Sequence, residues 1–319
     1  MIEVKHLTRR YGSTLAVDDV SFSVERGAIC GLLGPNGAGK STTMNIMTGC
    51  LAATDGEVRY DGLEIYADKD QVKRRIGYLP EQPPLYGDMT VWEYLDFVAR
   101  AKGLPRLQVT EEVKRTGFAC GLEEVIGRPI KNLSKGYKQR VGIAQALIGD
   151  PDVVILDEPT VGLDPIQIIE IRDLVKRLGE RHTVIVSSHI LSEIRALCDR
   201  IVIISKGRVV ADDTPENLEK LFAGSSTTVA TVRTSEGTAL SIASGVPHAG
   251  AVTCDPAAEE GAVDVRIEAA DDADIRAAVS RAFAERDVAL LQMVTSRASL
   301  EDVFVELTTE TPEEVEAPC

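Results

Sequence analysis

A glycine-rich octapeptide near the start of the chain, Gly34–Ser41 (GPNGAGKS), constrains its fold more than any other segment. It has the spacing G-x-x-x-x-G-K-S, in which the glycines let backbone N–H groups converge on phosphate oxygens and the lysine neutralises their charge. The apolar segment 28–33 precedes it, and Met44, Met47 and Leu51 follow at helical spacing, with Gly49 as a stop signal. Strand, loop and helix in this order predict a phosphate-binding P-loop.

A second motif lies far downstream, where the apolar run Val153–Leu156 ends in Asp157 and Glu158. Two carboxylates at the end of a strand are suited to hold Mg²⁺ and to activate a water molecule. Either pattern alone is common by chance. Together, in this order, they predict hydrolysis of a nucleoside triphosphate.

The charge is unevenly distributed along the 319 residues. The first 210 residues carry as many basic as acidic side chains, so the remainder accounts for the whole net charge of −15. This shift predicts a module boundary. It also argues against nucleic acid as a partner of the C-terminal third, because phosphates would be repelled.

Other compositional features argue against several classes of protein. The six cysteines are scattered without a C-x-x-C pair, so buried thiols are expected rather than a zinc site or disulfide framework. No apolar run approaches the roughly 18 residues of a membrane span, and the N-terminus lacks a basic-then-apolar signal. We therefore expect a cytoplasmic protein whose membrane role, if any, depends on a membrane partner.

Periodicity predicts the remaining elements of a larger first domain. Strands are expected at 2–7, 20–24, 28–33, 153–156, 183–186 and 201–204, and helices at 92–97, 109–120, 166–178 and 192–197. Continuous apolar strands that alternate with helices indicate a mainly parallel sheet covered on both faces. The predicted fold class is α/β, and residues 88–150 are expected to be largely helical.

A small acidic α+β domain is expected at 226–308, after a linker at 223–226. Its predicted strands lie near 228–233, 263–267 and 288–294, and an apolar helical face lies between the last two. A last helix is expected from Ser299, whose hydroxyl can cap it, and the acidic tail 309–319 is expected to be disordered.

A third motif decides between classes of P-loop protein. The segment Leu133–Arg140 (LSKGYKQR) offers a serine hydroxyl and free N–H groups at a helix start, which suits an anion, although a plain N-cap explains it equally well alone. With the P-loop and the Asp-Glu strand, however, the chain resembles the ATP-binding cassette (ABC) ATPases over residues 1–222. The resemblance makes this stretch an ABC nucleotide-binding domain and implies an α/β fold: a P-loop NTPase (RecA-like) core with an N-terminal antiparallel β region and a helical subdomain at about 88–150.

The resemblance implies a role for each matching residue. Tyr11 would stack on adenine, Gln82 would sense Mg²⁺ and the γ-phosphate, and Asp164 would signal across a dimer. Glu158 would be the general base and His189 would support the γ-phosphate, so Glu158, His189 and Gln82 form the catalytic set. The implied metal ligands are Ser41, Gln82 and Asp157. The implied ATP-binding residues are Tyr11, Gly34, Pro35, Asn36, Gly37, Ala38, Gly39, Lys40, Ser41, Thr42, Ser134, Gly136 and Asp164.

Two departures and one further similarity refine this picture. Lys135 and Tyr137 stand where the family usually has glycine and glutamine, whereas Ser134 and Gly136 match its pattern. The segment 299–308 is similar to the closing segment of ATPases that serve ABC-2 type permeases, most of which are exporters.

The family implies ATP and Mg²⁺ as cofactors and a homodimer, or a pair with a paralogous ATPase subunit, that closes on two ATP molecules. It implies a subunit that energises a separately encoded ABC-2 type permease, at the inner face of the membrane, for export. The helical segment after Gln82, including 89–97, would contact the permease. The alternatives are a soluble ABC-type ATPase acting on ribosomes, DNA or protein complexes, and a P-loop kinase or GTPase, against which the Asp-Glu strand and the signature segment speak.

Overall fold

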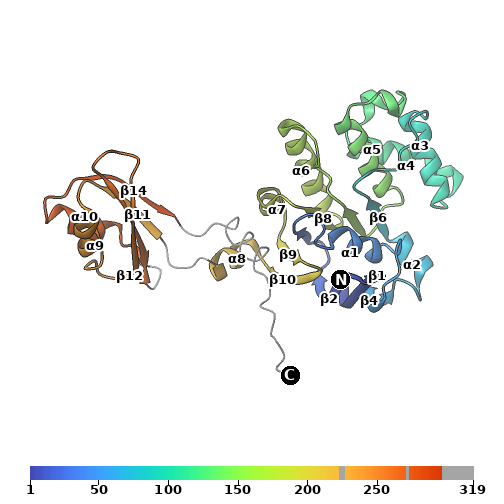
Figure 1. Cartoon of the computed structure of the whole chain (residues 1–319). Coiled ribbons are helices and arrows are strands. Elements are labelled where there is room, and N and C mark those ends of the chain that lie inside the picture. Colours follow the sequence, from blue (N-terminus) through green and yellow to red (C-terminus); the bar gives the residue numbers. More distant parts are fainter. Residues whose placement is uncertain (223–226, 271–272, 297–319) are drawn as a thin grey trace, which may run out of the picture. The chain divides into compact units, whose positions relative to one another are not determined.

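The computed structural model describes residues 1–222, 227–270 and 273–296 (Figure 1). The described residues form two compact units, Met1–Pro215 and a second unit that begins at Glu216. The helix expected from Ser299 and the tail expected to be disordered lie outside the described residues.

The first unit contains an antiparallel sheet in the order β2-β1-β4-β5. Its strands are β1 (Ile2–Tyr11), β2 (Thr14–Val24), β4 (Asp55–Tyr60) and β5 (Leu63–Glu64). The two N-terminal strands predicted from the sequence form, with a turn at Gly12 between them, and Ile2 pairs with both Val24 and Tyr60. One face of this sheet joins the main hydrophobic core.

The larger sheet has the order β10-β9-β3-β8-β7-β6, in which only the edge strand β10 runs antiparallel. Its strands are β3 (Ile29–Leu33), β6 (Ile76–Leu79), β7 (Val153–Leu156), β8 (Thr183–Ser188), β9 (Arg200–Ser205) and β10 (Arg208–Asp213). Every residue of β3, β7 and β8 is buried, as expected of parallel strands covered on both faces. The predicted parallel α/β core is therefore confirmed.

Helices flank this sheet, and α3 (Val91–Ala101), α4 (Arg106–Ala119) and α5 (Lys135–Leu147) form the helical subdomain. Further helices are α1 (Lys40–Met47), α2 (Lys69–Arg74), α6 (Pro165–Gly179) and α7 (Leu191–Leu197), with 3₁₀ turns at Glu123–Val125 and Ile130–Asn132. Thr90 and Glu93 form a capping box that starts α3. The helices α3, α4 and α5 contact one another, which confirms the predicted helical subdomain.

The second unit starts with α8 (Pro215–Phe222) and contains an antiparallel sheet in the order β12-β13-β11-β14. Its elements follow one another as β11 (Thr227–Val232), α9 (Glu236–Ala243), β12 (Ala249–Pro256), β13 (Val263–Ala269), α10 (Arg276–Ala284) and β14 (Leu290–Ser296). This βαββαβ arrangement is a split βαβ unit. It has its own core, which includes Phe283 and Ile267.

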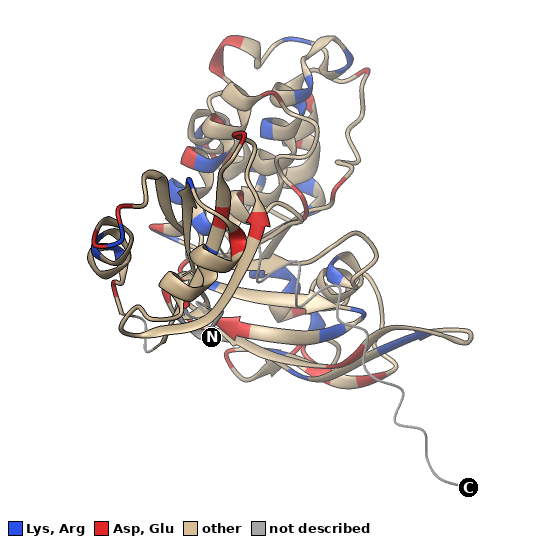
Figure 2. Cartoon of the chain, turned by 60° about the vertical axis from the view of Figure 1, so that its left-hand side comes forward, with Lys and Arg blue, Asp and Glu red and all other residues tan. Residues whose placement is uncertain are grey.

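Three elements of the second unit, α8, α9 and β12, were not predicted. The helix α9 contains Gly237, Thr238 and Ser241, which are poor helix formers, and β12 begins Ala-Gly-Ala, which has low strand propensity. Both form because tertiary packing buries Ile242 and partly buries Val252. In the sequence of this unit, acidic residues outnumber basic ones. Figure 2 colours the acidic and basic positions along the ribbon of the chain.

The cysteines only partly follow the expectation of buried thiols. Cys30, Cys120 and Cys198 are buried, and burial raises the pKa of Cys30 and of Cys120 to about 12. Cys50 is exposed and Cys254 is half-buried, so for these two the expectation was wrong. Within the described ranges, no helix has the length and apolarity needed to cross a membrane.

Candidate nucleotide site

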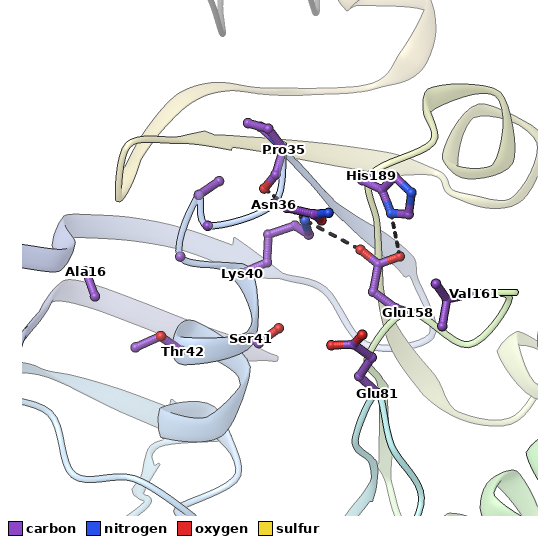
Figure 3. A pocket seen from close by; sticks show the side chains of 13 residues that line it. Ala16, Pro35, Asn36, Lys40, Ser41, Thr42, Glu81, Glu158, Val161 and His189 are labelled. Carbon is purple, nitrogen blue, oxygen red and sulfur yellow. Dashed lines mark hydrogen bonds and ion pairs between the residues drawn. The ribbon is translucent and has the colours of Figure 1, made fainter.

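The P-loop joins β3 to α1 and has a backbone that requires glycine at two places (Figure 3). Gly37 and Gly39 have φ values of 81° and 107°, in the left-handed region that glycine tolerates best. A Cβ on Gly39 would also lie 2.6 Å from the carbonyl oxygen of Ala16. The loop therefore stays tight, with the first N–H groups of α1 free to face an anion.

Lys40 is the first residue of α1, and its ammonium group is buried in the pocket. Its Nζ donates hydrogen bonds to the carbonyl oxygens of Gly34 at 2.6 Å and Pro35 at 3.2 Å. It lies 3.5 Å from Oε1 of Glu158. A buried ammonium group needs such partners, and phosphate oxygens could replace them.

The two acidic residues follow β7 and are held by the neighbouring strands. The N–H of Asp157 donates to the carbonyl oxygen of Leu79 in β6 at 2.9 Å. Ser187, at the end of β8, donates from Oγ to Oδ1 of Asp157 at 2.6 Å and accepts from the N–H of Glu158 at 2.8 Å. Glu158 has a φ of 47°, which is uncommon for a residue with a side chain.

His189 completes the group, directly after β8. Its Nδ1 lies 3.0 Å from Oε2 of Glu158. Glu158 thus faces Lys40 with one oxygen and His189 with the other, as the dashed lines in Figure 3 show. The glycine loop and the acidic strand end, far apart in the sequence, meet in one place.

A pocket of about 350 Å³ opens at this point. It is lined by Ala16, Pro35, Asn36, Gly37, Ala38, Gly39, Lys40, Ser41, Thr42, Glu81, Glu158, Val161 and His189. The buried ammonium group of Lys40 and the N–H donors of the P-loop on one wall, with carboxylates on the other, suit a polyphosphate whose terminal phosphate is attacked by water.

Four residues expected at this site do not line the pocket. Asp157 lies just behind it and is 2% exposed, and Gly34 is buried at the end of β3. Tyr11 is exposed, with the Arg9 guanidinium carbon 4.8 Å from the centre of its ring. Gln82 is also exposed, whereas its neighbour Glu81 lines the pocket.

The signature residues lie around a separate pocket of about 350 Å³, lined by Ser134, Gly136 and Asp164 among others. Ser134 caps α5 by accepting from the N–H of Tyr137 at 3.3 Å, and Asp164 caps α6 by accepting from the N–H of Gln167 at 2.9 Å. Within the described part of one chain, these residues do not share the pocket of the P-loop.

The signature segment packs closely on its neighbours both at Lys135, which departs from the family pattern, and at Gly136, which matches it. The side chain of Lys135 folds over Gly162, at the position a Cβ there would occupy, and Gly162 has a φ of 66°. A Cβ on Gly136 would lie 2.7 Å from Oε1 of Gln167. The start of α5 therefore packs closely against the loop before α6 and against the first turn of α6.

Several polar residues that support the site were not predicted from the sequence. Ser187 positions both acidic residues, as described above. Glu193 accepts from the hydroxyl groups of Thr160 at 2.6 Å and Ser188 at 3.1 Å, which ties the segment after Glu158 to α7. The only sequence signal was a pair of serines at the end of a buried strand, directly before His189.

The chemistry of the donors fits Mg²⁺ bound together with a nucleotide. Mg²⁺ prefers oxygen ligands and in nucleotide sites takes one or two from carboxylates and the rest from phosphates and water. The pocket region offers the Ser41 hydroxyl and the Asp157 carboxylate. Among the described residues, no group of three or more His, Cys, Asp and Glu side chains could hold a metal by itself.

Fold and site together define an ATPase of the P-loop class, built as an ABC cassette. Residues 17–161 match the family model described as ABC transporter. The lantibiotic transport ATP-binding protein SrtF of Streptococcus pyogenes is 38% identical over 226 residues, covering 70% of this chain and 96% of the relative. The bacitracin transport ATP-binding protein BcrA of Bacillus licheniformis is 38% identical over 222 residues, covering 69% and 72%.

Solved structures of ABC transporter ATPases are also similar to this chain. A bacterial ABC transporter cassette solved as a dimer superposes with a TM-score of 0.61 at 28% identity, covering 67% of this chain and 98% of that one. The cbiO1 protein of Clostridium perfringens, part of an ABC transporter complex, gives 0.63 at 29% identity, covering 68% and 89%. The chain belongs to the ABC transporter ATP-binding proteins and hydrolyses ATP for transport, which confirms the predicted fold class and activity.

Proposed function

We propose that this chain energises a separately encoded ABC-2 type permease and drives export from the cytoplasm. The observation that carries the proposal is the meeting of Lys40 and Glu158, 3.5 Å apart, in a pocket formed by the P-loop. The names of relatives refer to lantibiotic, bacitracin and multidrug transport, which supports a membrane transporter as the partner of this ATPase.

In the proposed cycle, two copies, or one copy and a paralogous subunit, close on two ATP molecules. The N–H groups of the P-loop and Lys40 of one copy hold the phosphates, and Ser134 and Gly136 of the other cover the γ-phosphate. The placement of the signature residues around a second pocket supports this division, because one copy alone does not bring them to its own P-loop. Tyr11 would stack on the adenine.

Magnesium would be held by Ser41 and Asp157, and it would neutralise charge on the β- and γ-phosphates. Glu158 would accept a proton from the attacking water, and its carboxylate is already oriented by His189. His189 and Lys40 would stabilise the charge on the terminal phosphate, so catalysis would rest on positioning and electrostatics.

We propose a nucleotide-binding domain at 1–222 and an accessory domain at 226–308, although the compact units divide earlier, between Pro215 and Glu216. The helix α3 and the loop before it are proposed to receive the permease at the inner face of the membrane. Exposed aromatic rings support this surface, because Tyr86 and Phe97 are 54% and 43% exposed and pack edge-on at 5.6 Å. Exposed apolar surface of this kind marks interaction sites.

Purification from membranes tests the proposed partnership. A tagged full-length chain, extracted in mild detergent, should bring down an integral membrane protein in a fixed ratio, and the complex should hydrolyse ATP faster than the isolated subunit. Phe97→Ser should lose the membrane partner but keep basal ATP hydrolysis, whereas Phe118→Ser, which changes a more exposed ring on α4, should keep both. Recovery with ribosomes and without any membrane protein would instead favour the soluble alternative.

A further inference from the structure

Arg9 and Tyr11 lie two residues apart on β1, and their side chains contact each other. The guanidinium carbon of Arg9 lies 4.8 Å from the centre of the Tyr11 ring, within the range of a cation–π interaction. Residues two apart on a strand share one face of the sheet, which brings the two side chains together. Tyr11 is 46% exposed, so a planar ligand can reach the face of the ring that Arg9 does not cover.

The hydrogen bonding of Arg9 is unusual for a partly buried arginine. Its Nη1 donates to the carbonyl oxygen of Ala52 at 3.0 Å. Its Nε is buried, yet it has no hydrogen-bond partner among the described residues. A buried donor without a partner costs free energy, so hydrogen bonding alone does not explain an arginine at this position. Contact with the ring does, because a guanidinium group is planar and weakly hydrated and stacks on aromatic faces.

Arg9 also connects the Tyr11 ring to α1, the helix that begins in the P-loop. The segment directly before Ala52 is hydrogen-bonded back to the carbonyl oxygen of Asn45 in α1. On the neighbouring strand, Arg9 pairs with Val17, whose side chain lies 3.7 Å from the position that a Cβ on Gly39 would occupy. Arg9 is therefore linked to the segments at both ends of α1, and the ring it contacts is held relative to the P-loop.

We propose that Arg9 is a positioning residue for the base of the nucleotide: its guanidinium group holds one face of the Tyr11 ring while adenine stacks on the other. The ligand that benefits is a nucleoside triphosphate. A bare polyphosphate that occupies only the P-loop gains nothing from the pair. Without the guanidinium group the ring loses a contact that restricts its rotation, and stacking must then order it at a cost in entropy. This inference rests on the proposed function, because it assigns a second residue to the stacking role proposed for Tyr11.

Calorimetry with two ligands that share the same chain of phosphates tests the proposal. The affinity of the full-length protein is measured for ATP and for inorganic tripolyphosphate, each with Mg²⁺. Arg9→Met removes the charge and the plane of the side chain, so ATP should bind about three- to tenfold more weakly. Tripolyphosphate has no base and should bind as it does to the wild type. An equal loss for both ligands, or an unchanged affinity for ATP, would overturn the positioning role.

Arg10→Met is the matched control. Arg10 is the next residue on β1 and is exposed, so its replacement should leave both affinities unchanged. Thermal unfolding without ligand shows whether each variant is folded. If Arg9→Met unfolds at a lower temperature than the wild type, Arg9→Lys takes its place. That variant keeps the charge but not the planar group and should show a smaller loss, confined to ATP.

A double-mutant cycle tests whether Arg9 acts through Tyr11. Tyr11→Ala should weaken ATP binding and not tripolyphosphate binding, and adding Arg9→Met to it should cause no further loss. A further loss as large as that in Arg9→Met alone would contradict the inference, and so would unchanged ATP affinity in Tyr11→Ala. Wild-type protein that binds neither ligand would contradict the proposed function itself, which is a different result from any of these.

Discussion

Ser187 is the residue on which the geometry of the acidic pair depends. It is fully buried, and its single hydroxyl group serves both Asp157 and the N–H of Glu158. Because Glu158 has a left-handed backbone that costs free energy, this hydrogen bond helps to hold it in place. Ser187 is a positioning residue and would not touch the nucleotide.

Ser187→Ala should lower ATP turnover while ATP affinity stays near that of the wild type, since the P-loop is untouched. The free energy of unfolding should fall by about 1–3 kcal/mol, because a buried N–H and a buried carboxylate each lose a partner. Steady-state hydrolysis, calorimetry and urea unfolding measure the three quantities. Thr116→Ala, which removes another buried hydroxyl far from the pocket, is the control for lost stability. Equal turnover in the two variants would contradict the positioning role.

For single residues, the two sequence motifs were enough to predict that Lys40 and Glu158 lie close together. Each motif follows the carboxyl end of a buried strand, and in a parallel sheet these ends lie at the same edge. The sequence was not enough to distinguish Glu81 from Gln82. Glu81 lines the pocket and Gln82 does not, and the tertiary contacts that anchor the loop after β6 at Pro83 and Pro84 are revealed by no local pattern.

Among the elements, strands with unbroken apolar runs were predictable. The bounds of β7 match the prediction, and those of β9 differ by one residue at each end. The strand β6 was missed because Ile76–Leu79 is short and contains Gly77. That glycine is required where the strand crosses α5, since a Cβ would collide with the carbonyl oxygen of Ala146. The close approach is a property of the tertiary structure.

The turn between β4 and β5 is tied to the rest of the first unit by Asp61. Its carboxylate accepts from Nε of Arg26 at 2.9 Å and lies 3.8 Å from Arg75, which precedes β6. The hydrogen bond from Arg26 is the largest influence on the pKa of Asp61 and, against desolvation, holds it at about 2. One carboxylate thus joins the turn between β4 and β5 to the segments that contain Met1, Arg26 and Arg75.

The pH dependence of unfolding should reveal this link. A carboxyl whose pKa is lowered by folding stabilises the folded state above the unfolded value of about 3.9, and this contribution is lost as the pH falls toward 2. Asp61→Asn should therefore flatten the fall in unfolding free energy between pH 4 and pH 2, by up to about 1 kcal/mol for a partly exposed pair. Asp70→Asn, on the surface of α2, should leave the wild-type profile. Identical profiles for Asp61→Asn and the wild type would contradict the role of Asp61.

In the whole molecule, the two units have separate hydrophobic cores. The sequence indicated this division through its charge, because the acidic excess begins where the nucleotide-binding motifs end. The split βαβ topology of the second unit was not predictable, since pairing between β11 and β13 joins strands far apart in the chain.

Phe283→Ala should destabilise the second unit alone. Phe283 is completely buried in its core, so truncation should cost about 3–5 kcal/mol there. In scanning calorimetry the transition of the first unit is recognised because Mg²⁺ and ATP raise its temperature, and this transition should not move. Leu291→Ala, at an exposed position of β14, should change neither transition. A loss of ATP affinity in Phe283→Ala would show that the units do not fold independently.

The central claim is that Lys40 and Glu158 act on one ATP molecule between two copies of the cassette. Size-exclusion chromatography of Glu158→Gln with and without ATP and Mg²⁺, together with its rate of hydrolysis, tests it most directly. The account predicts a dimer only with ATP and Mg²⁺ and a turnover reduced about 100-fold or more, whereas Lys40→Ala should bind ATP poorly and stay monomeric. Undiminished turnover in Glu158→Gln, or unchanged ATP affinity in Lys40→Ala, would contradict it.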